Sequence, residues 1–106
     1  MGIRDIIRKV ILGHQANSDL YINYLKKIGV TIGERVTIFE PRKVYIDETR
    51  PFLISIGDDV KITNGVTILT HGYDWNVLEG VYNKVLGSAG KVTIGNNVFI
   101  GFHSTI

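Results

Sequence analysis

Aliphatic residues recur at every sixth position over most of the chain after residue 30. The spacing is clearest in three runs, 32–38, 56–68 and 94–106, and each run begins with the motif Ile-Gly-x-x-Val. A six-residue period is typical of β-helices, because three short strands joined by sharp turns form one triangular coil of about 18 residues. In such a coil the aliphatic residue of each hexad points inward, and stacked coils place like residues above like. The pattern therefore predicts a mainly β chain folded as a parallel β-helix.

A small residue, Gly or Thr, usually follows the inward aliphatic residue, and we expect glycine and asparagine at the corners, where unusual φ angles are needed. The competing interpretation is an antiparallel sandwich, whose strands would also alternate apolar and polar residues. A sandwich does not require Ile-Gly-x-x-Val three times over, so the spacing favours the β-helix.

One or two short helices precede the repeats, which divides the chain into a helical segment at 1–29 and a β-helix at 30–106. The first helix is predicted to end near Gly13. Its aliphatic face is expected to pack against the rest of the domain, and contact with a partner or a membrane surface is the alternative. That face consists of Ile3, Ile6, Ile7, Val10 and Ile11. A second helix is predicted to begin at Asn17 or Ser18, either of which can cap it, and to end at Gly29. Its apolar face consists of Tyr21, Tyr24, Leu25 and Ile28.

Two segments interrupt the hexads. Residues 44–55 run longer than the period allows, and Asp47, Glu48 and Pro51 lie in this excursion. The larger interruption is a long loop at about 73–91. An insertion of that length inside a repeat array usually serves function rather than the core.

The composition argues against several classes of function and excludes cysteine chemistry. The 106 residues suffice for one domain, and the net charge of +2 comes from interspersed charges rather than from a basic stripe, which argues against nucleic-acid binding. The chain has no cysteine, which excludes disulfides, thiolate metal sites and a cysteine nucleophile. Charged residues interrupt the apolar N-terminus, so we expect no signal peptide and no membrane span, and a cytoplasmic location is the default.

The segments 62–75, which reads ITNGVTILTHGYDW, and 92–101, which reads VTIGNNVFIG, resemble hexapeptide-repeat acyltransferases. The likeness is greatest to the maltose, galactoside and exopolysaccharide O-acetyltransferases. It implies a left-handed parallel β-helix, assembly as a homotrimer, and acetyl-CoA bound in a groove between subunits. It also implies that a histidine at the place of His71 acts as general base on the acceptor hydroxyl, while the extended loop helps to wall the site.

The chemistry suits an imidazole. Free imidazole has a pKa of about 6.5, and a positioned base typically accelerates such a transfer by about 10²–10⁴-fold. Relatives of the exopolysaccharide type often carry Asp directly after this histidine, where the chain has Gly72. Asp74 is the candidate substitute for that acidic partner; otherwise it is a solvated loop residue. His14 and His103 have no motif support, and we predict that neither is catalytic.

Four further residues are candidates by resemblance. Asn64 is expected to contact the acceptor, or else to be a turn residue that favours left-handed φ. Trp75 is expected to stack on the sugar, or else to anchor the loop on the next subunit. Gly101 and Phe102 match the place where relatives offer backbone N–H groups to the acetyl group; the alternative is an ordinary repeat corner.

The sequence thus predicts an acetyl-CoA-dependent O-acetyltransferase, or an N-terminal fragment of one, acting on a sugar hydroxyl with no metal required. The chain ends at Ile106, at the start of a hexad, where relatives continue with further coils, so it looks truncated. A non-catalytic β-helix that serves as an oligomerisation scaffold is the alternative.

Overall fold

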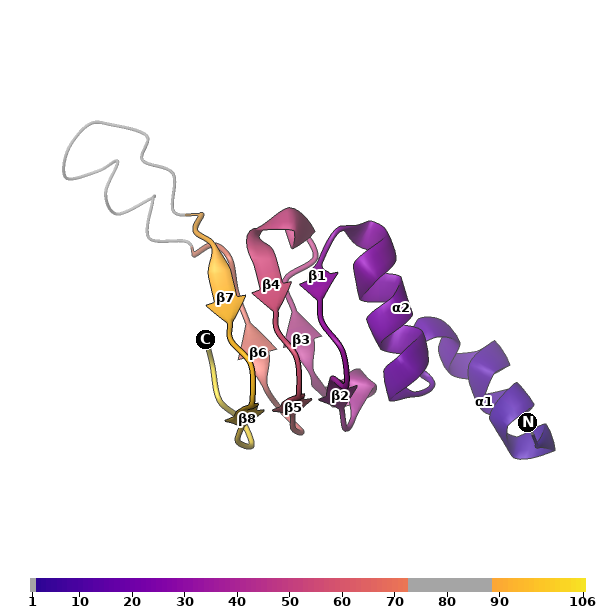
Figure 1. The fold of residues 1–106 in the computed structure, drawn as a ribbon. Helices are drawn as coiled ribbons and strands as arrows, with labels where there is room; N and C mark the ends of the chain where they lie inside the picture. Colours follow the sequence, from indigo (N-terminus) through magenta and orange to yellow (C-terminus); the bar gives the residue numbers. More distant parts are fainter. Residues whose placement is uncertain (1, 73–88) are drawn as a thin grey trace.

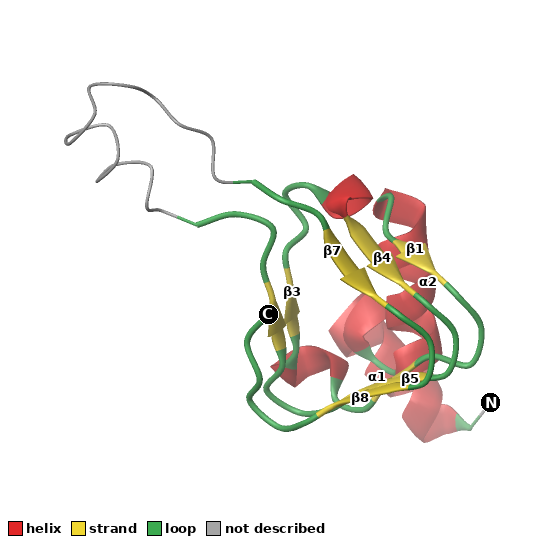
Figure 2. Ribbon diagram, turned by 60° about the vertical axis from the view of Figure 1, so that its left-hand side comes forward, coloured by secondary structure: helices red, strands yellow, loops and turns green. Residues whose placement is uncertain are grey.

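A computed structural model describes residues 2–72 and 89–106, and it shows three parallel sheets around one apolar interior (Figure 1). The strands are β1 Thr31–Ile32, β2 Thr37–Ile38, β3 Tyr45–Ile46, β4 Ile54–Ile56, β5 Val60–Ile62, β6 Thr67–Ile68, β7 Val92–Ile94 and β8 Val98–Ile100. They form sheets in the orders β1-β4-β7, β2-β5-β8 and β3-β6. Each successive strand triplet therefore gives one strand to each sheet, and Figure 2 shows the sheets as separate sides around the interior.

This arrangement is that of a parallel β-helix fragment, as the six-residue period predicts. Every strand pairing among the described residues is parallel, so the antiparallel sandwich is wrong. The left-handed sense of the helix stays a prediction.

Stacked isoleucines form the core. The columns, read from the first coil outward, are Ile32-Ile56-Ile94, Ile38-Ile62-Ile100 and Ile46-Ile68. All eight side chains are buried. Burying one aliphatic side chain contributes about 1.5–3 kcal/mol before the entropy of ordering is counted. Because each coil shares this burial with its neighbours, the stack rather than the single coil is the stable unit.

Two short 3₁₀ turns explain the irregular spacing in the first coil. Pro41–Lys43 forms a turn between β2 and β3, and Pro51–Leu53 forms another between β3 and β4. The extra residues are thus accommodated at corners. The strands on either side keep their places, because β3 still pairs with β6 in the register Ile46↔Ile68.

The expectation that glycine supplies the unusual φ at the corners is wrong for the Ile-Gly-x-x-Val motif. The left-handed residues there are Arg35, Asp59 and Asn97, with φ of 56°, 56° and 57°. The motif glycine is needed for space instead. A Cβ on Gly57 would lie 2.8 Å from the carbonyl carbon and oxygen of Gly95 in the next coil. Stacked backbones approach so closely here that only glycine fits.

Helix α2, Ser18–Ile28, covers the first coil (Figure 1). The Asn17 side chain caps it by accepting a hydrogen bond from the Leu20 N–H, and the helix ends at Gly29, as predicted. Leu25 is fully buried, and the Ser18 hydroxyl accepts a hydrogen bond of 2.9 Å from the Ile38 N–H of β2. This helix closes the apolar interior at one end.

Helix α1, Ile3–Leu12, does not pack against the prism, contrary to expectation. It is followed by a 3₁₀ turn, Gly13–Gln15, and projects beyond α2 (Figure 1). The side chains of its predicted apolar face are exposed. No helix within 2–72 or 89–106 has the length and hydropathy needed to cross a bilayer.

Candidate functional site

His71 and Asp47 form a close pair at one corner of the prism. Asp47 follows β3 directly, and His71 lies three residues after β6, the strand stacked on β3. Nδ1 of His71 lies 2.6 Å from Oδ2 of Asp47. The imidazole is 22% exposed, whereas the carboxylate is completely buried. The stacking of two coils thus joins an acid and a base that are 24 residues apart in the chain.

Threonine donors surround the buried carboxylate. Oδ1 accepts hydrogen bonds from the backbone N–H and the hydroxyl of Thr49, at 3.0 and 2.7 Å. Oδ2 accepts hydrogen bonds from the backbone N–H and the hydroxyl of Thr70, at 3.1 and 2.7 Å. Both carboxylate oxygens therefore have hydrogen-bond donors within the protein, and Oδ2 also contacts the His71 ring. These contacts fix the orientation of the carboxylate.

The donors keep Asp47 ionised. Burial by itself would raise the pKa of this carboxyl, because a low-dielectric surrounding disfavours charge. The hydrogen bonds from Thr49 and Thr70 act in the opposite direction and together hold the pKa well below its ordinary value. The group beside His71 is therefore a carboxylate at neutral pH.

A carboxylate accepts hydrogen bonds but cannot donate them, so the short contact assigns the Nδ1 proton to His71. The neutral ring then carries its lone pair on Nε2. A histidine held in this tautomer by a buried acid is arranged to take up a proton at Nε2, and the acid stabilises the imidazolium that forms. The corner thus has the two groups that general-base catalysis on a hydroxyl needs.

Asp47 was missed as the acidic partner of His71. The resemblance pointed to residues that follow the histidine, and Asp74, the candidate there, lies outside the described residues. The irregular spacing at 44–55 hides the partnership, because a coil of about 18 residues would place Asp47 level with residue 65, before β6, rather than near His71. Placing Ile46 level with Ile68 would have put Asp47 beside the end of β6.

Two other predicted residues share a groove. Asn64 and Phe102 line a hollow of about 380 Å³ on the protein surface. Its other lining residues are Phe39, Glu40, Thr63 and Phe99. Gly101 adjoins Phe102, and its carbonyl accepts hydrogen bonds from the N–H and hydroxyl of Ser104. The alternative that Asn64 is a turn residue with left-handed φ is wrong. Gly65 takes that conformation instead, with φ of 80°.

The groove and His71 lie at opposite ends of strand β6, which forms one side of the second coil. Asn64 stands in the turn that precedes β6, and His71 comes after β6. A single chain therefore brings Asn64 and Phe102 together but does not bring either to the imidazole. Trp75, the remaining substrate candidate, lies outside the described residues.

The other two histidines contact neighbouring residues of the fold. His14 stacks on Tyr24 with ring centroids 3.8 Å apart. His103 is in a left-handed turn, with φ of 60°, directly over Gly65, where its ring occupies the space that a side chain at 65 would need. That neither is catalytic stays a prediction.

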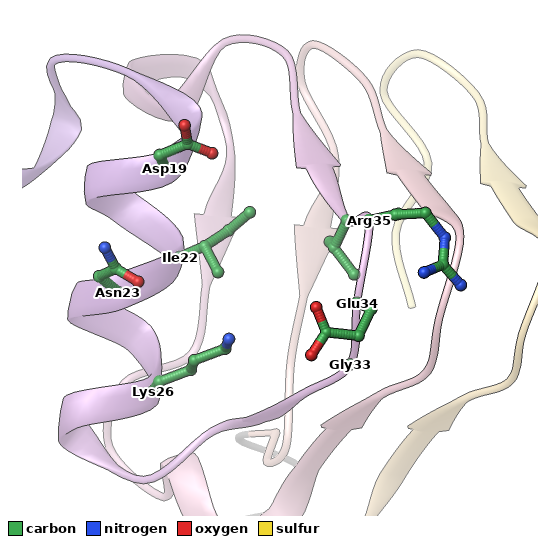
Figure 3. A pocket seen from close by; sticks show the side chains of 8 residues that line it. Asp19, Ile22, Asn23, Lys26, Gly33, Glu34 and Arg35 are labelled. Carbon is green, nitrogen blue, oxygen red and sulfur yellow. The ribbon is translucent and has the colours of Figure 1, made fainter.

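A second hollow, of about 370 Å³, lies between α2 and the turn after β1 (Figure 3). Its charged lining residues are Asp19, Lys26, Glu34 and Arg35, of which Arg35 forms an ion pair with Asp59 at 2.7 Å. These charges balance, and the hollow belongs to the first coil, whereas His71 belongs to the second. It contributes nothing to the histidine site.

The chain is similar to parts of known proteins. The chain is 35% identical over 83 residues to the protein CapG of Staphylococcus aureus, in a match that covers 77% of this chain and 46% of CapG. It is 47% and 43% identical over 51 residues to the UDP-3-O-acylglucosamine N-acyltransferases of Rickettsia typhi and Rickettsia bellii, covering 48% of this chain and 14% and 15% of those proteins. No protein-family model and no solved structure matches.

These similarities support an acyltransferase of the hexapeptide-repeat type. They do not single out one member. The chain spans about half the length of CapG and a smaller part of the N-acyltransferases.

Proposed function

We propose that this chain supplies the general base of an acetyl-CoA-dependent O-acetyltransferase that acts on a sugar hydroxyl. The contact of 2.6 Å between His71 Nδ1 and the buried Asp47 carboxylate supports this proposal most directly. A histidine in an ordinary surface turn is not expected to contact a buried carboxylate whose two oxygens already accept hydrogen bonds from other groups. The choice of acetyl-CoA and of a sugar hydroxyl rests on the resemblance of the segment 62–75 to sugar O-acetyltransferases.

The proposed reaction needs no covalent enzyme intermediate. Nε2 of His71 takes the proton of the acceptor hydroxyl as its oxygen attacks the thioester carbonyl carbon. The tetrahedral intermediate then collapses, the carbon–sulfur bond breaks, and the imidazolium returns the proton to the departing sulfur. Asp47 stays ionised throughout and stabilises the imidazolium. The products are the acetyl ester and the free thiol.

We propose that the chain assembles as a homotrimer, and the placement of the candidate residues supports a site shared between copies. Because the groove of Asn64 and Phe102 lies at the far end of β6 from His71, one chain cannot surround a substrate with both. A neighbouring copy that brings its groove corner to the His71 corner completes the site. We propose this arrangement for acetyl-CoA, with Gly101 and Phe102 against the acetyl group and Asn64 against the acceptor.

An amine acceptor is the second candidate, since the Rickettsia relatives are named as N-acyltransferases. The same imidazole would take a proton from the attacking amine. Comparing each sugar with its amino-sugar counterpart separates the two acceptor classes. A scaffold without activity is the remaining alternative.

The test is release of free thiol from acetyl-CoA in the presence of a panel of sugars and amino sugars. His71→Asn is expected to lower kcat/KM by about 10²–10⁴-fold, the usual contribution of a general base. His103→Asn is the matched control, because it makes the same replacement at an exposed histidine and asparagine tolerates a left-handed φ. A folded trimer that neither binds CoA nor releases thiol would support the scaffold instead.

A further inference from the structure

Helix α1 is short and cationic, and its apolar face is exposed. Five aliphatic side chains between 48% and 79% exposed make up the face: Ile3, Ile6, Ile7, Val10 and Ile11. The helix is joined to the rest of the fold through the 3₁₀ turn Gly13–Gln15 and projects away from the prism (Figure 1). The face is therefore free to meet a surface without disturbing the core.

The charged residues are arranged around this face in a particular order. At about 100° per residue, the aliphatic positions span an arc of about 140°. Arg4 falls at one border of the arc, and Asp5 falls opposite its centre. Arg8 lies beyond Arg4 on the same side, where its Nε–H donates a hydrogen bond of 2.7 Å to the Ala16 carbonyl.

We propose that α1 docks the protein on an anionic lipid surface. In that position the aliphatic face enters the boundary between head groups and acyl chains, Arg4 lies level with the lipid phosphates, and Asp5 faces water. The helix has three cations and one anion, which complements a negative surface. A second α1 would carry the same net positive charge, so self-pairing is opposed by like charge. This inference is independent of the role of His71.

Co-sedimentation of the whole chain with vesicles tests the proposal. We expect binding to vesicles of phosphatidylcholine mixed with phosphatidylglycerol, much weaker binding to phosphatidylcholine alone, and loss of binding as salt screens the charges. Val10→Glu puts an acid at the most exposed position of the face, at 79%, and is expected to weaken binding at least about tenfold.

Phe52→Glu is the matched control. Phe52 is 72% exposed on the 3₁₀ turn Pro51–Leu53, so the variant loses a comparable apolar side chain and gains the same charge away from α1. Circular dichroism establishes that both variants keep their secondary structure. The proposal is overturned if the wild-type chain does not bind anionic vesicles, or if Val10→Glu and Phe52→Glu bind them equally. It is also overturned if Val10→Glu only dissociates an oligomer in light scattering, because the face then contacts another copy.

Discussion

Replacing Asp47 by Asn removes one charge while keeping the shape of the side chain, and it disturbs both folding and the histidine. In the wild type, Oδ1 faces two donors of Thr49, and Oδ2 faces two donors of Thr70 together with His71 Nδ1. An amide has one oxygen and one NH₂ group. Whichever way it turns, the NH₂ group meets a backbone N–H, either that of Thr49 or that of Thr70.

The structure sets the expected magnitudes. A backbone N–H in this corner left without an acceptor costs about 1–3 kcal/mol of stability. If the NH₂ group faces His71, it donates to Nδ1 and moves the ring proton to Nε2, which removes the base. The loss in kcat/KM then approaches the full general-base contribution of about 10²–10⁴-fold. If the amide oxygen faces His71, the tautomer survives, and the loss is smaller because a neutral group stabilises the imidazolium less.

Urea denaturation at several pH values measures the stability effect. The folded pKa of Asp47 is lowered, so its contribution is present above the unfolded value of about 3.9 and is lost as the pH falls below it. The free-energy gap between wild type and Asp47→Asn is therefore expected to be largest near neutrality and to shrink below about pH 4. Thiol release measures the catalytic effect.

Asp59→Asn is the control for this experiment. Asp59 is an exposed acid paired with Arg35 at 2.7 Å, and solvent screening leaves such an exposed pair little effect on stability. The reasoning fails if Asp47→Asn matches Asp59→Asn in both stability and kcat/KM, because the buried carboxylate would then neither stabilise the corner nor orient His71.

Two further predictions concern the stacking of coils. Gly57→Ala is expected to cost about 1–3 kcal/mol of unfolding free energy, because its Cβ would meet the next backbone, whereas Gly90→Ala, with no atom within 4 Å of the added Cβ, leaves the urea midpoint nearly unchanged. An equal effect of the two would refute the close approach. Asp58→Ala is expected to lower the thermal midpoint, because Asp58 Oδ1 accepts a hydrogen bond of 2.7 Å from the Glu34 N–H, while Asp58→Asn keeps that acceptor and most of the stability. A similar loss in both Asp58 variants would show that the hydrogen bond contributes little.

The sequence by itself determined the repeat architecture. The period of six is imposed by the geometry of a short strand and a turn, so it reveals which residues face inward whatever lies above or below them. Ile56, Ile62 and Ile68 could be placed in the core on this basis, and the structure confirms that they are buried. The boundaries of α2 were equally local, because Asn17 caps its own helix and Gly29 ends it.

The tertiary structure decided what depends on how one coil sits on the next. Gly57 is glycine because another backbone passes over it, and local φ preference, the basis of the sequence interpretation, gives no sign of this. His71 was identifiable from its motif, but its partner Asp47 is chosen by the stacking of β3 on β6. The 3₁₀ turn at Pro51–Leu53 shifts the count between these strands, so only the folded register, which is set by packing between coils, brings the acid to the base.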